Sequence, residues 1–535
     1  MNAFGIATSR RASARFAIAS EPATPGEKTT LSHLHTNQPP SPSATSRVKP
    51  LALALAVAVG ASFAADHAAA SDSASTRPDG SILWSVENCN DAGAGSLRAT
   101  AAHAVDGDAI DLGGLACSTI SLTTGSITLH DIDLLGPGAN ALAIDGAGNQ
   151  NRRTFNHVGH GGSLNIHDVT LRNGKYLSNA GQGGGCLRSE GGSLRVYDSV
   201  FSGCFAFAAT GSNVNVRGGA IAAYGGYVLQ SGVTLANNQV RSANGDALGG
   251  AVYAAGTDLV IRNSTITNNS ATAISAAAFP RGGGVFTHGW AAIEGSSLDG
   301  NLSEGGGGGA VVEAGGVLRR STVSNNSAIG GASGIAFLGA PAASAGVYSS
   351  TISDNRTEAS VQWGSGALYM NTAGAVIANS TIAGNTESNV DSIQWGAGIL
   401  FGPAASGIVM ISTIAYGNNF HNDEHTFIGL DINGPTGAVI GGNHDQVGSS
   451  TLILPAGTEA SDPMLGPLQD NGGPTWTRMP AAHSIAINSG TDNGETTDQR
   501  GYPRVSGPVA DVGAVETITD SIFANGFEDC HLRCL

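Results

Sequence analysis

The apolar residues of this chain occur in short runs and alternations rather than at helical spacing. Each run is bounded by Gly or Asn, which is typical of short β-strands. One such segment, STITNNSA at 264–271, returns as STVSNNSA at 321–328 and as STISDN at 350–355. The aligned apolar residue of this segment recurs about every 30 residues, at Leu171, Phe201, Leu235, Ile266, Leu298, Val323, Ile352, Ile382 and Ile414.

A second segment, led by Gly, alternates with the first. Examples are GGAIAAYGG at 218–226 and GGAVYAAG at 249–256, and a middle strand such as DLVIRN at 258–263 lies between the two segments. A period of this size indicates a solenoid, and three strands per turn with turns about 4.8 Å apart make a parallel β-helix. We therefore expect an all-β fold, a right-handed parallel β-helix solenoid of roughly eleven coils with an N-terminal helical cap and a C-terminal capping module.

The repeated segment also predicts a structural role for its asparagines. In stacked coils their side-chain amides lie over one another at one corner, where each can donate to the next and form a ladder. Asn also tolerates the left-handed backbone that such a corner needs. The expected ladder consists of the third residue after each aligned apolar position, namely Asn238, Asn269, Asn301, Asn326, Asn355 and Asn385.

Changes in composition along the chain suggest its organisation. RVKP at 47–50 followed by an apolar run at 51–64 is typical of a signal peptide and too short to span a bilayer. We expect cleavage after Ala64 or Ala70 and a true start near Val48, with a genuinely long leader as the alternative. The expected parts are a leader (1–65), a linker (66–80), an N-terminal cap (81–109), the β-helix (110–454), a C-terminal module (455–516) and a tail (517–535).

The N-terminal cap should contain a short helix within 95–105, with Ser96 as its N-cap. No other apolar run approaches the roughly 18 residues of a transmembrane helix, so the mature chain is expected to have none. The six cysteines fit export to an oxidising compartment and lie in locally spaced pairs. We expect three disulfides, Cys89–Cys117, Cys186–Cys204 and Cys530–Cys534.

The net charge of the chain limits the classes of partner that it could bind. The formal net charge of −16 argues against nucleic acid. Glycine supplies 78 of 535 residues and aromatic residues only 5%, so the core should be thin and tightly layered.

Three segments carry a resemblance to known families. NCNDAGAGSLRATAAHAVDGDAIDL at 88–112 resembles the beginning of bacterial surface β-helix proteins related to the polymorphic outer-membrane protein group. Residues 462–491, with 497–505 and 511–516, resemble the choice-of-anchor Q module, and the tail at 520–529 is similar to C-terminal tails of exported proteobacterial proteins. The resemblance implies a pectin-lyase-like fold on the outer-membrane surface of a Gram-negative bacterium, or released from it.

Many β-helices of this kind cleave acidic polysaccharides, and this activity requires a recognisable set of side chains. A hydrolase needs two carboxylates, one to protonate the leaving oxygen and one to activate water. GHGG at 159–162 is not accompanied by such a pair, and His160 is interpreted as a turn residue. The candidate bases of a lyase (Arg262, Arg281, Arg319, Arg320) and candidate carboxylates (Asp258, Asp299, Asp354, Asp391) share no strand register, so no catalytic residue is assigned.

Two acidic clusters could hold calcium, although the spacing of the first departs from an EF-hand loop. The first comprises Asp106, Asp108 and Asp111, and the second Asp492, Glu495 and Asp498. No cofactor is otherwise expected. Trp363 and Trp395 lie one repeat apart and could form a contact face for sugar, or pack against each other.

The sequence therefore predicts an exported, non-enzymatic β-helix, displayed on or released from the cell surface, that is adhesive or binds an extracellular glycan or surface component. Residues that vary between repeats, such as Tyr253, His288 and Tyr369, are expected to be free to meet that partner. The alternative is a polysaccharide lyase or glycoside hydrolase of the pectin-lyase-like fold.

Overall fold

The computed structural model of the protein describes residues 73–148, 152–177, 181–209, 214–256, 258–339, 345–358, 366–388, 396–421 and 426–518. The chain divides into two units, 1–67 and 68–535, and all described residues belong to the second. The predicted leader, the Cys530–Cys534 pair, Trp363, Trp395 and Asp391 lie outside the described residues.

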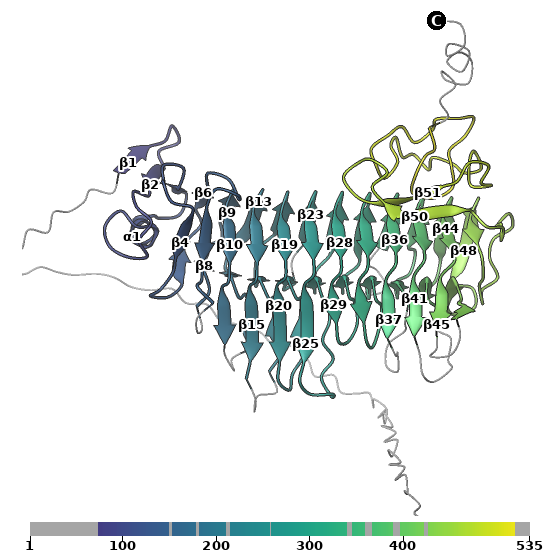
Figure 1. Cartoon of the computed structure of the whole chain (residues 1–535), viewed down its shortest axis with the longest axis horizontal. Coiled ribbons are helices and arrows are strands. Elements are labelled where there is room, and N and C mark those ends of the chain that lie inside the picture. The colour runs from purple at the N-terminus through teal and green to yellow at the C-terminus, as the bar shows by residue number, and fades with distance from the viewer. Residues whose placement is uncertain are drawn as a thin grey trace, which may run out of the picture. The chain divides into compact units, whose positions relative to one another are not determined.

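The described residues form four long sheets that the chain visits in a fixed order, turn after turn (Figure 1). Strand pairing between consecutive turns is parallel, and the whole is an all-β solenoid of the right-handed type. Each full turn contributes one strand to each sheet. The sequence pattern predicted only three strands per turn, because the short polar strand after each ladder Asn, such as SATA at 270–273, has no clear apolar alternation.

Sheet 1 has fourteen strands: β1 (Ser73–Thr76), β2 (Ile82–Ser85), β3 (Ala109–Asp111), β6 (Asp133–Leu135), β9 (Ser163–His167), β13 (Ser193–Tyr197), β18 (Val228–Ser231), β23 (Leu259–Arg262), β27 (Ala291–Glu294), β31 (Gly316–Arg319), β35 (Ala345–Tyr348), β39 (Val376–Ala378), β43 (Ile408–Ile411) and β48 (Val439–Asn443). Sheet 2 has twelve: β4 (Thr119–Ser121), β7 (Ala143–Asp145), β10 (Thr170–Arg172), β14 (Val200–Ser202), β19 (Thr234–Ala236), β24 (Thr265–Thr267), β28 (Ser297–Asp299), β32 (Thr322–Ser324), β36 (Thr351–Ser353), β40 (Thr381–Ala383), β44 (Ile414–Tyr416) and β49 (Gln446–Val447).

Sheet 3 has ten strands: β11 (Lys175–Leu177), β15 (Phe205–Ala208), β20 (Gln239–Ser242), β25 (Ser270–Ala273), β29 (Leu302–Ser303), β33 (Ser327–Ala328), β37 (Arg356–Glu358), β41 (Thr386–Ser388), β45 (Asn419–His421) and β46 (Thr426–Ile428). Sheet 4 has eleven: β5 (Ile127–Leu129), β8 (Phe155–Val158), β12 (Leu187–Glu190), β17 (Ile221–Ala223), β22 (Val252–Ala254), β26 (Val285–Thr287), β30 (Ala310–Val312), β34 (Ile335–Phe337), β38 (Leu368–Met370), β42 (Ile399–Phe401) and β47 (Ile432–Asn433). Two small pairs complete the strands, β16 (Val216–Arg217) with β21 (Ala247–Leu248), and β50 (Leu465–Gln469) with β51 (Thr477–Pro480).

The number of full turns follows from sheet 3. Its last strand, β46, runs antiparallel to β45 within the same turn, so its ten strands correspond to nine turns. Incomplete turns at 109–158 and 439–459 lie on either side of them, so the roughly eleven coils expected from the sequence are matched only roughly.

The inside of the solenoid is filled largely by apolar side chains that stack from turn to turn. In sheet 2 the aligned residues pair directly from turn to turn, as Leu171 with Phe201 and Ile352 with Ile382, and these side chains are fully buried. The last position was misaligned: Ile382 pairs with Ala415, while Ile414 pairs with Thr381 and faces outward under the C-terminal module. The segment STIAYGN at 412–418 has one residue more than the preceding segment STIAGN at 380–385, and this shifts the register.

The asparagines form a continuous buried ladder at the corner between sheets 2 and 3. In each step a backbone N–H and a side-chain Nδ2 donate to Oδ1 of the Asn in the next turn, as from Asn326 to Asn355 at 3.1 and 2.9 Å. The ladder begins at Cys204, whose N–H donates to Asn238, and extends beyond the expected residues through Asn418 to Asp431. Positive φ angles fall on the residue before each ladder Asn rather than on the Asn itself: Asn237, Asn268, Gly300, Asn325, Asp354, Gly384 and Gly417.

A second ladder, made of hydroxyl groups, lies at the corner between sheets 1 and 2. The N–H of each turn donates to the side-chain oxygen of the next, as Ser264 does to Ser296 at 3.1 Å. The ladder continues through Ser321, Ser350 and Ser380. Further along the chain, the N–H of Thr413 donates to Oδ1 of Asp445 at 2.9 Å.

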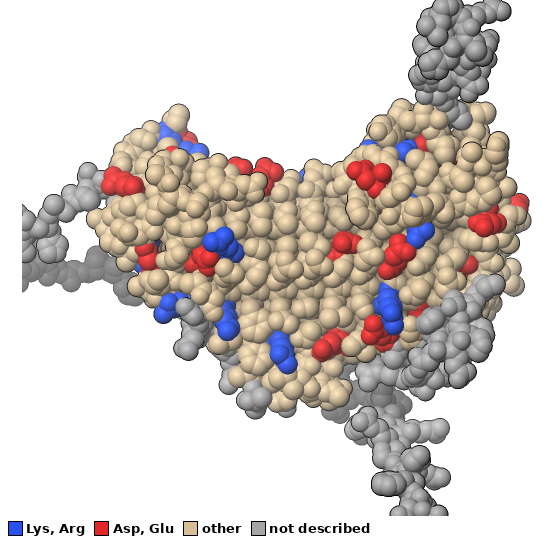
Figure 2. All heavy atoms as spheres, viewed as in Figure 1, with Lys and Arg blue, Asp and Glu red and all other residues tan. Residues whose placement is uncertain are grey.

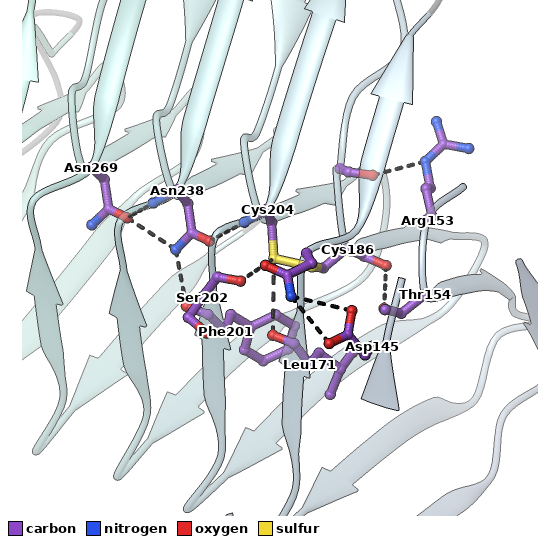
Figure 3. Close-up of a disulfide and its surroundings, with 12 residues drawn as sticks. Asp145, Arg153, Thr154, Leu171, Cys186, Phe201, Ser202, Cys204, Asn238 and Asn269 are labelled. Atoms are coloured by element: carbon purple, nitrogen blue, oxygen red, sulfur yellow. Dashed lines mark hydrogen bonds between the residues drawn. A yellow bond between two sulfur atoms is a disulfide. The ribbon is translucent and has the colours of Figure 1, made fainter. Parts of the chain in front are cut away.

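Two disulfides brace the N-terminal half. Cys89–Cys117 joins the cap to the first turns, and Cys186–Cys204 joins sheet 4 to the start of the Asn ladder (Figure 3). The cap contains the only helix of the described residues, α1 (Leu97–His103), whose first turn is capped by the Ser96 side chain accepting from the N–H of Ala99. That helix is far too short to cross a membrane, and the described residues contain no longer one.

The C-terminal module lies along the flank of the last full turns, on the outer face of sheet 2 (Figure 1). Gln499 accepts from Thr351 at 2.6 Å and donates to Thr322 at 2.9 Å, and Arg478 pairs with Asp354 at 2.7 Å. The outward threonines of β32, β36 and β40 are therefore buried, whereas Thr265 on β24 is exposed. Closer to the end of the solenoid, Ser450 and Glu459 bridge to the last rungs.

Candidate functional site

A groove of about 460 Å³ opens on the outer face of sheet 1, near its first turns. Its floor is formed by residues in direct register on neighbouring strands, because Asp133 of β6 pairs with Asn165 of β9, and Asn165 pairs with Arg195 of β13. Strand side chains alternate between core and solvent, so these three point outward while Leu164 and Ile166 fill the core.

The floor is polar and ordered by its own contacts. Asn165 donates to Asp133 at 2.7 Å, and Arg195 donates to the Ser163 hydroxyl at 2.8 Å. Two residues further along the same strands, the rings of His167 and Tyr197 stack with centroids 4.6 Å apart and an interplanar angle of 11°. The groove thus presents a carboxylate, an amide and a guanidinium beside a flat aromatic pair.

One wall of the groove is the corner between sheets 4 and 1 in three successive turns. Asp106, His130 and His160 occupy this corner, and one potential ligand atom of each lies within 4.8 Å of the others. His160 Nδ1 is 2.7 Å from Asp106 Oδ2, and the rings of His130 and His160 stack at 5.5 Å. His160 is therefore a turn residue, as expected, but it is also a member of a cluster.

Asp131 fixes the shape of this wall from beneath. Its Oδ2 accepts the N–H groups of His160 and Gly162 at 2.7 and 2.9 Å, and its Oδ1 lies 3.0 Å from Nε2 of buried His157. Burial opposes ionisation of Asp131, but the His160 N–H, the His157 ring and the Gly162 N–H outweigh it and hold the pKa of Asp131 below its usual range. Both oxygens of the Asp131 carboxylate are therefore engaged in contacts that hold the turn at 159–162.

Burial lowers the pKa of His157, even though Asp131 favours its protonated form. A neutral ring that donates from Nε2 to Asp131 leaves Nδ1 as an acceptor, and the Ser189 hydroxyl lies 2.7 Å from it. His157 is thus a structural support of the groove wall. Neither His130 nor His157 was singled out from the sequence, since only the turn-by-turn alignment of the corner brings them to this place.

The first predicted calcium cluster does not converge. Asp108 accepts from the N–H of Ile82, the indole of Trp84 and the N–H of Val105, and these contacts tie the cap together. Asp111 accepts from the N–H of Gly113 in its own loop. Of the three predicted ligands only Asp106 joins the histidine cluster.

The second predicted cluster is likewise divided among separate partners. Asp492 accepts from the N–H of Gly494, and Glu495 pairs with Arg319 at 2.6 Å. Asp498 is buried and pairs with Arg500 at 2.7 Å. These carboxylates build the C-terminal module and its contact with sheet 1.

The candidate lyase bases are each engaged in ion pairs. Arg262 and Arg320 share Glu294, and Arg281 pairs with Glu313 at 2.9 Å. Glu294 and both of its partners border a second hollow of about 310 Å³ beside the C-terminal module.

The candidate carboxylates lie apart from one another. Asp299 accepts from Ser324 and Asn325 on sheet 2, Asp354 pairs with Arg478 of the module, and Asp258 is exposed at the start of β23. The described members of that set do not gather with the arginines into one site.

An outer aromatic row on sheet 4 proves to be packing rather than a contact face. Tyr253 and Tyr369, which we expected to be free, are 3% and 8% exposed. Tyr253 stacks on Phe286 at 5.9 Å, and the Arg217 guanidinium lies over its ring. His288, also expected to be free, has its Nδ1 2.5 Å from Glu313. Loops on this side therefore cover a satellite core.

No protein-family model matches the chain, and neither does any curated protein. Among solved structures it is similar to tailspike protein 3 of bacteriophage CBA120, at 13% identity and a TM-score of 0.20. That alignment covers 60% of this chain and 55% of the tailspike, so it spans little more than half of the phage protein. A similarity this distant gives no evidence for the fold. The parallel strand pairing of the chain itself shows that it is a parallel β-solenoid.

Proposed function

We propose that this chain is an exported, non-enzymatic β-helix of the cell surface that binds a neutral extracellular glycan in the groove on sheet 1. The observation that carries the proposal is the register of Asp133, Asn165 and Arg195 across three neighbouring strands. Sugar hydroxyls both donate and accept, and a carboxylate, an amide and a guanidinium in one row supply both functions. The stacked His167–Tyr197 pair lies two residues further along the same strands and adds aromatic surface next to this row.

The charge of the groove favours a neutral glycan over a polyuronate. Its lining residues include Asp106, Asp108, Asp131 and Asp133, against the guanidinium groups of Arg195 in the lining and of Arg77, which pairs with Asp133 at 3.3 Å. The chain as a whole carries a formal net charge of −16. A polyanion would be repelled by such a surface, and Figure 2 shows that the few basic residues of one flank are scattered singly. The same repulsion weakens the alternative of a lyase acting on pectin or alginate.

Export and surface attachment are supported by the sequence rather than by the groove. The n-region and apolar run at 47–64 favour secretion, and the two disulfides fit an oxidising compartment. We further propose that residues 455–516 belong to the choice-of-anchor Q type, that the repeats are related to the polymorphic outer-membrane group, and that the protein acts at the outer surface of a Gram-negative bacterium. In this proposal the tail serves sorting or attachment.

A glycan-array screen with purified mature protein tests the proposal. The groove variant Asn165→Ala/Arg195→Ala is expected to lose binding to the neutral glycans that the unaltered chain retains. Arg241→Ala is the matched control, because Arg241 is an exposed strand arginine on sheet 3. Retained binding by the groove variant would contradict the site, and release of unsaturated or reducing sugars from a polysaccharide would favour the enzymatic alternative.

A further inference from the structure

Beyond glycan binding, we propose that Asp106, His130 and His160 form a binding site for a divalent transition metal of the zinc class. The three residues come from successive turns of one corner, so the stacking of the solenoid itself brings them together. Their sequence separations gave no metal motif, because the spacing is set by the length of a turn rather than by a local loop.

The donor set selects the metal. Two imidazole nitrogens and one carboxylate oxygen suit zinc, which takes His and Asp ligands at about 2.0–2.2 Å. Calcium and magnesium prefer oxygen ligands alone. The calcium site considered from the sequence is therefore replaced by a zinc-class site that shares only Asp106 with it.

The supporting contacts leave the ligand atoms available. Asp106 Oδ1 accepts the N–H of Asp131 at 3.1 Å, which orients the carboxylate and turns Oδ2 toward His160. Asp131 in turn fixes the backbone of His160. Such outer contacts orient ligands in metal sites generally.

His130 provides the second, independent indication. Its Nδ1 is buried and has no hydrogen-bond partner among the described residues. A buried polar atom without a partner destabilises a fold, and coordination of a metal would satisfy it. Its ring already stacks against that of His160.

Closure onto a metal requires only local movement. The potential ligand atoms lie within 4.8 Å of one another, somewhat wider than bonds of about 2.0–2.2 Å allow in a tetrahedron. The side chains of His160 and Asp106 are 59% and 43% exposed and can rotate. A metal would replace the direct contact between His160 Nδ1 and Asp106 Oδ2.

Three protein ligands leave a fourth position on the metal. Water or a hydroxyl of a bound glycan could occupy it. This last role rests on the proposed function, whereas metal binding itself does not.

The test is equilibrium binding of Zn²⁺ to the mature chain, after removal of any affinity tag, with cobalt absorption as a second readout. We expect one Zn²⁺ per chain, with affinity at least about tenfold weaker in Asp106→Asn, His130→Ala and His160→Ala. The matched control is His288→Ala, since His288 forms a His–carboxylate pair with Glu313 and should leave zinc binding unchanged. Circular dichroism of each variant checks folding.

The absorption spectrum of Co²⁺ added to the unaltered chain tests the site without any substitution. An absorption band of protein-ligated, low-symmetry Co²⁺ supports the site, and the spectrum of aqueous Co²⁺ overturns it. Stoichiometric zinc that is unaffected by all three substitutions overturns it as well. Zinc binding is also measured in Asn165→Ala/Arg195→Ala, where we expect it to persist. Glycan binding with and without a chelator then separates the two proposals, since either can fail while the other stands.

Discussion

The side-chain amide of Asn418 donates to Oδ1 of Asp431 at 2.8 Å, and with this contact the buried amide ladder ends on a carboxylate. The N–H of Asn418 donates to the same oxygen at 2.9 Å, so the last acceptor receives two hydrogen bonds. A side-chain amide at position 431 would bring a donor as well as an acceptor, whereas the last step of the ladder requires only a hydrogen-bond acceptor. The repeated Ser-Thr phrase of the sequence is thus a device for joining turns, with a defined start at Cys204 and a defined end at Asp431.

Removal of one interior rung should destabilise the solenoid. Asn326 donates to the carbonyl of Leu298 and to Asn355, and it accepts from the backbone and side chain of Asn301. Asn326→Ala leaves these buried groups without partners and should cost about 1–3 kcal/mol of unfolding free energy. Denaturant titration provides the measurement, and Asn90→Ala, on an exposed loop, is the control. Equal effects of the two substitutions would contradict the ladder.

The buried side chain of Asp445 should make stability depend on pH. Burial raises the pKa of Asp445 to about 7, although the Thr413 N–H favours its ionised form. The unfolded value lies near 3.9, so the folded chain binds the proton more tightly, and its stabilising contribution is full below about pH 4 and is lost as pH rises through about 7. We expect Tm to fall between about pH 4 and pH 7 and to level off at higher pH.

Asp445→Asn should flatten that dependence, since an uncharged amide carries no burial cost of ionisation. At pH 8 it should raise stability by an amount on the order of a few kcal/mol, and at pH 4 it should change little. Exposed Asp258 provides the control through Asp258→Asn. An unaltered pH profile in Asp445→Asn would place the titration elsewhere.

Loss of the Cys186–Cys204 disulfide, at the start of the Asn ladder, should destabilise the protein. Cys186 and Cys204 are 18 residues apart, and the chain-entropy account gives about 3 kcal/mol for a loop of that length. Cys186→Ala/Cys204→Ala should lower the unfolding free energy accordingly. Peptide mapping without reductant checks the pairing itself; free thiols at these positions in protein made in the periplasm would refute it.

The C-terminal module should detach locally when its central contact is removed. Gln499 is 1% exposed and links Thr322 and Thr351 of sheet 2 to Thr475 of the module. In Gln499→Ala we expect faster amide hydrogen exchange at 465–516 and little change at β9 and β13, because contacts that bury few residues open locally. Uniform acceleration along the whole chain would mean that the module and the solenoid unfold as one.

The fold could be predicted because each turn repeats the same demands. The sequence repeats three features in each turn: Gly at the tight corners, an apolar residue such as Ile266 in the core, and an Asn at the ladder position. The fourth strand escaped notice because its polar residues neither alternate nor cluster. Ile414 was misplaced because one added residue moved Ala415 into the core, which only the strand register reveals.

The candidate site could not be predicted in the same way. Asp106, His130 and His160 are 24 and 30 residues apart, and they meet only when the exact length of the first irregular turns is known. Asp133, Asn165 and Arg195 are ordinary polar residues until register aligns them. Conversely, Tyr253 and Tyr369 vary between repeats in the way that contact residues do, but loops bury them.

The most direct test of the account is a hydrogen-exchange footprint of the mature chain with a neutral glycan identified by the array. We predict that bound glycan slows exchange at the turn 159–162 and along β9 and β13, the strands that carry Asn165 and Arg195. Unchanged exchange at these segments, with protection instead around Trp363 and Trp395, would contradict the placement of the binding site on sheet 1.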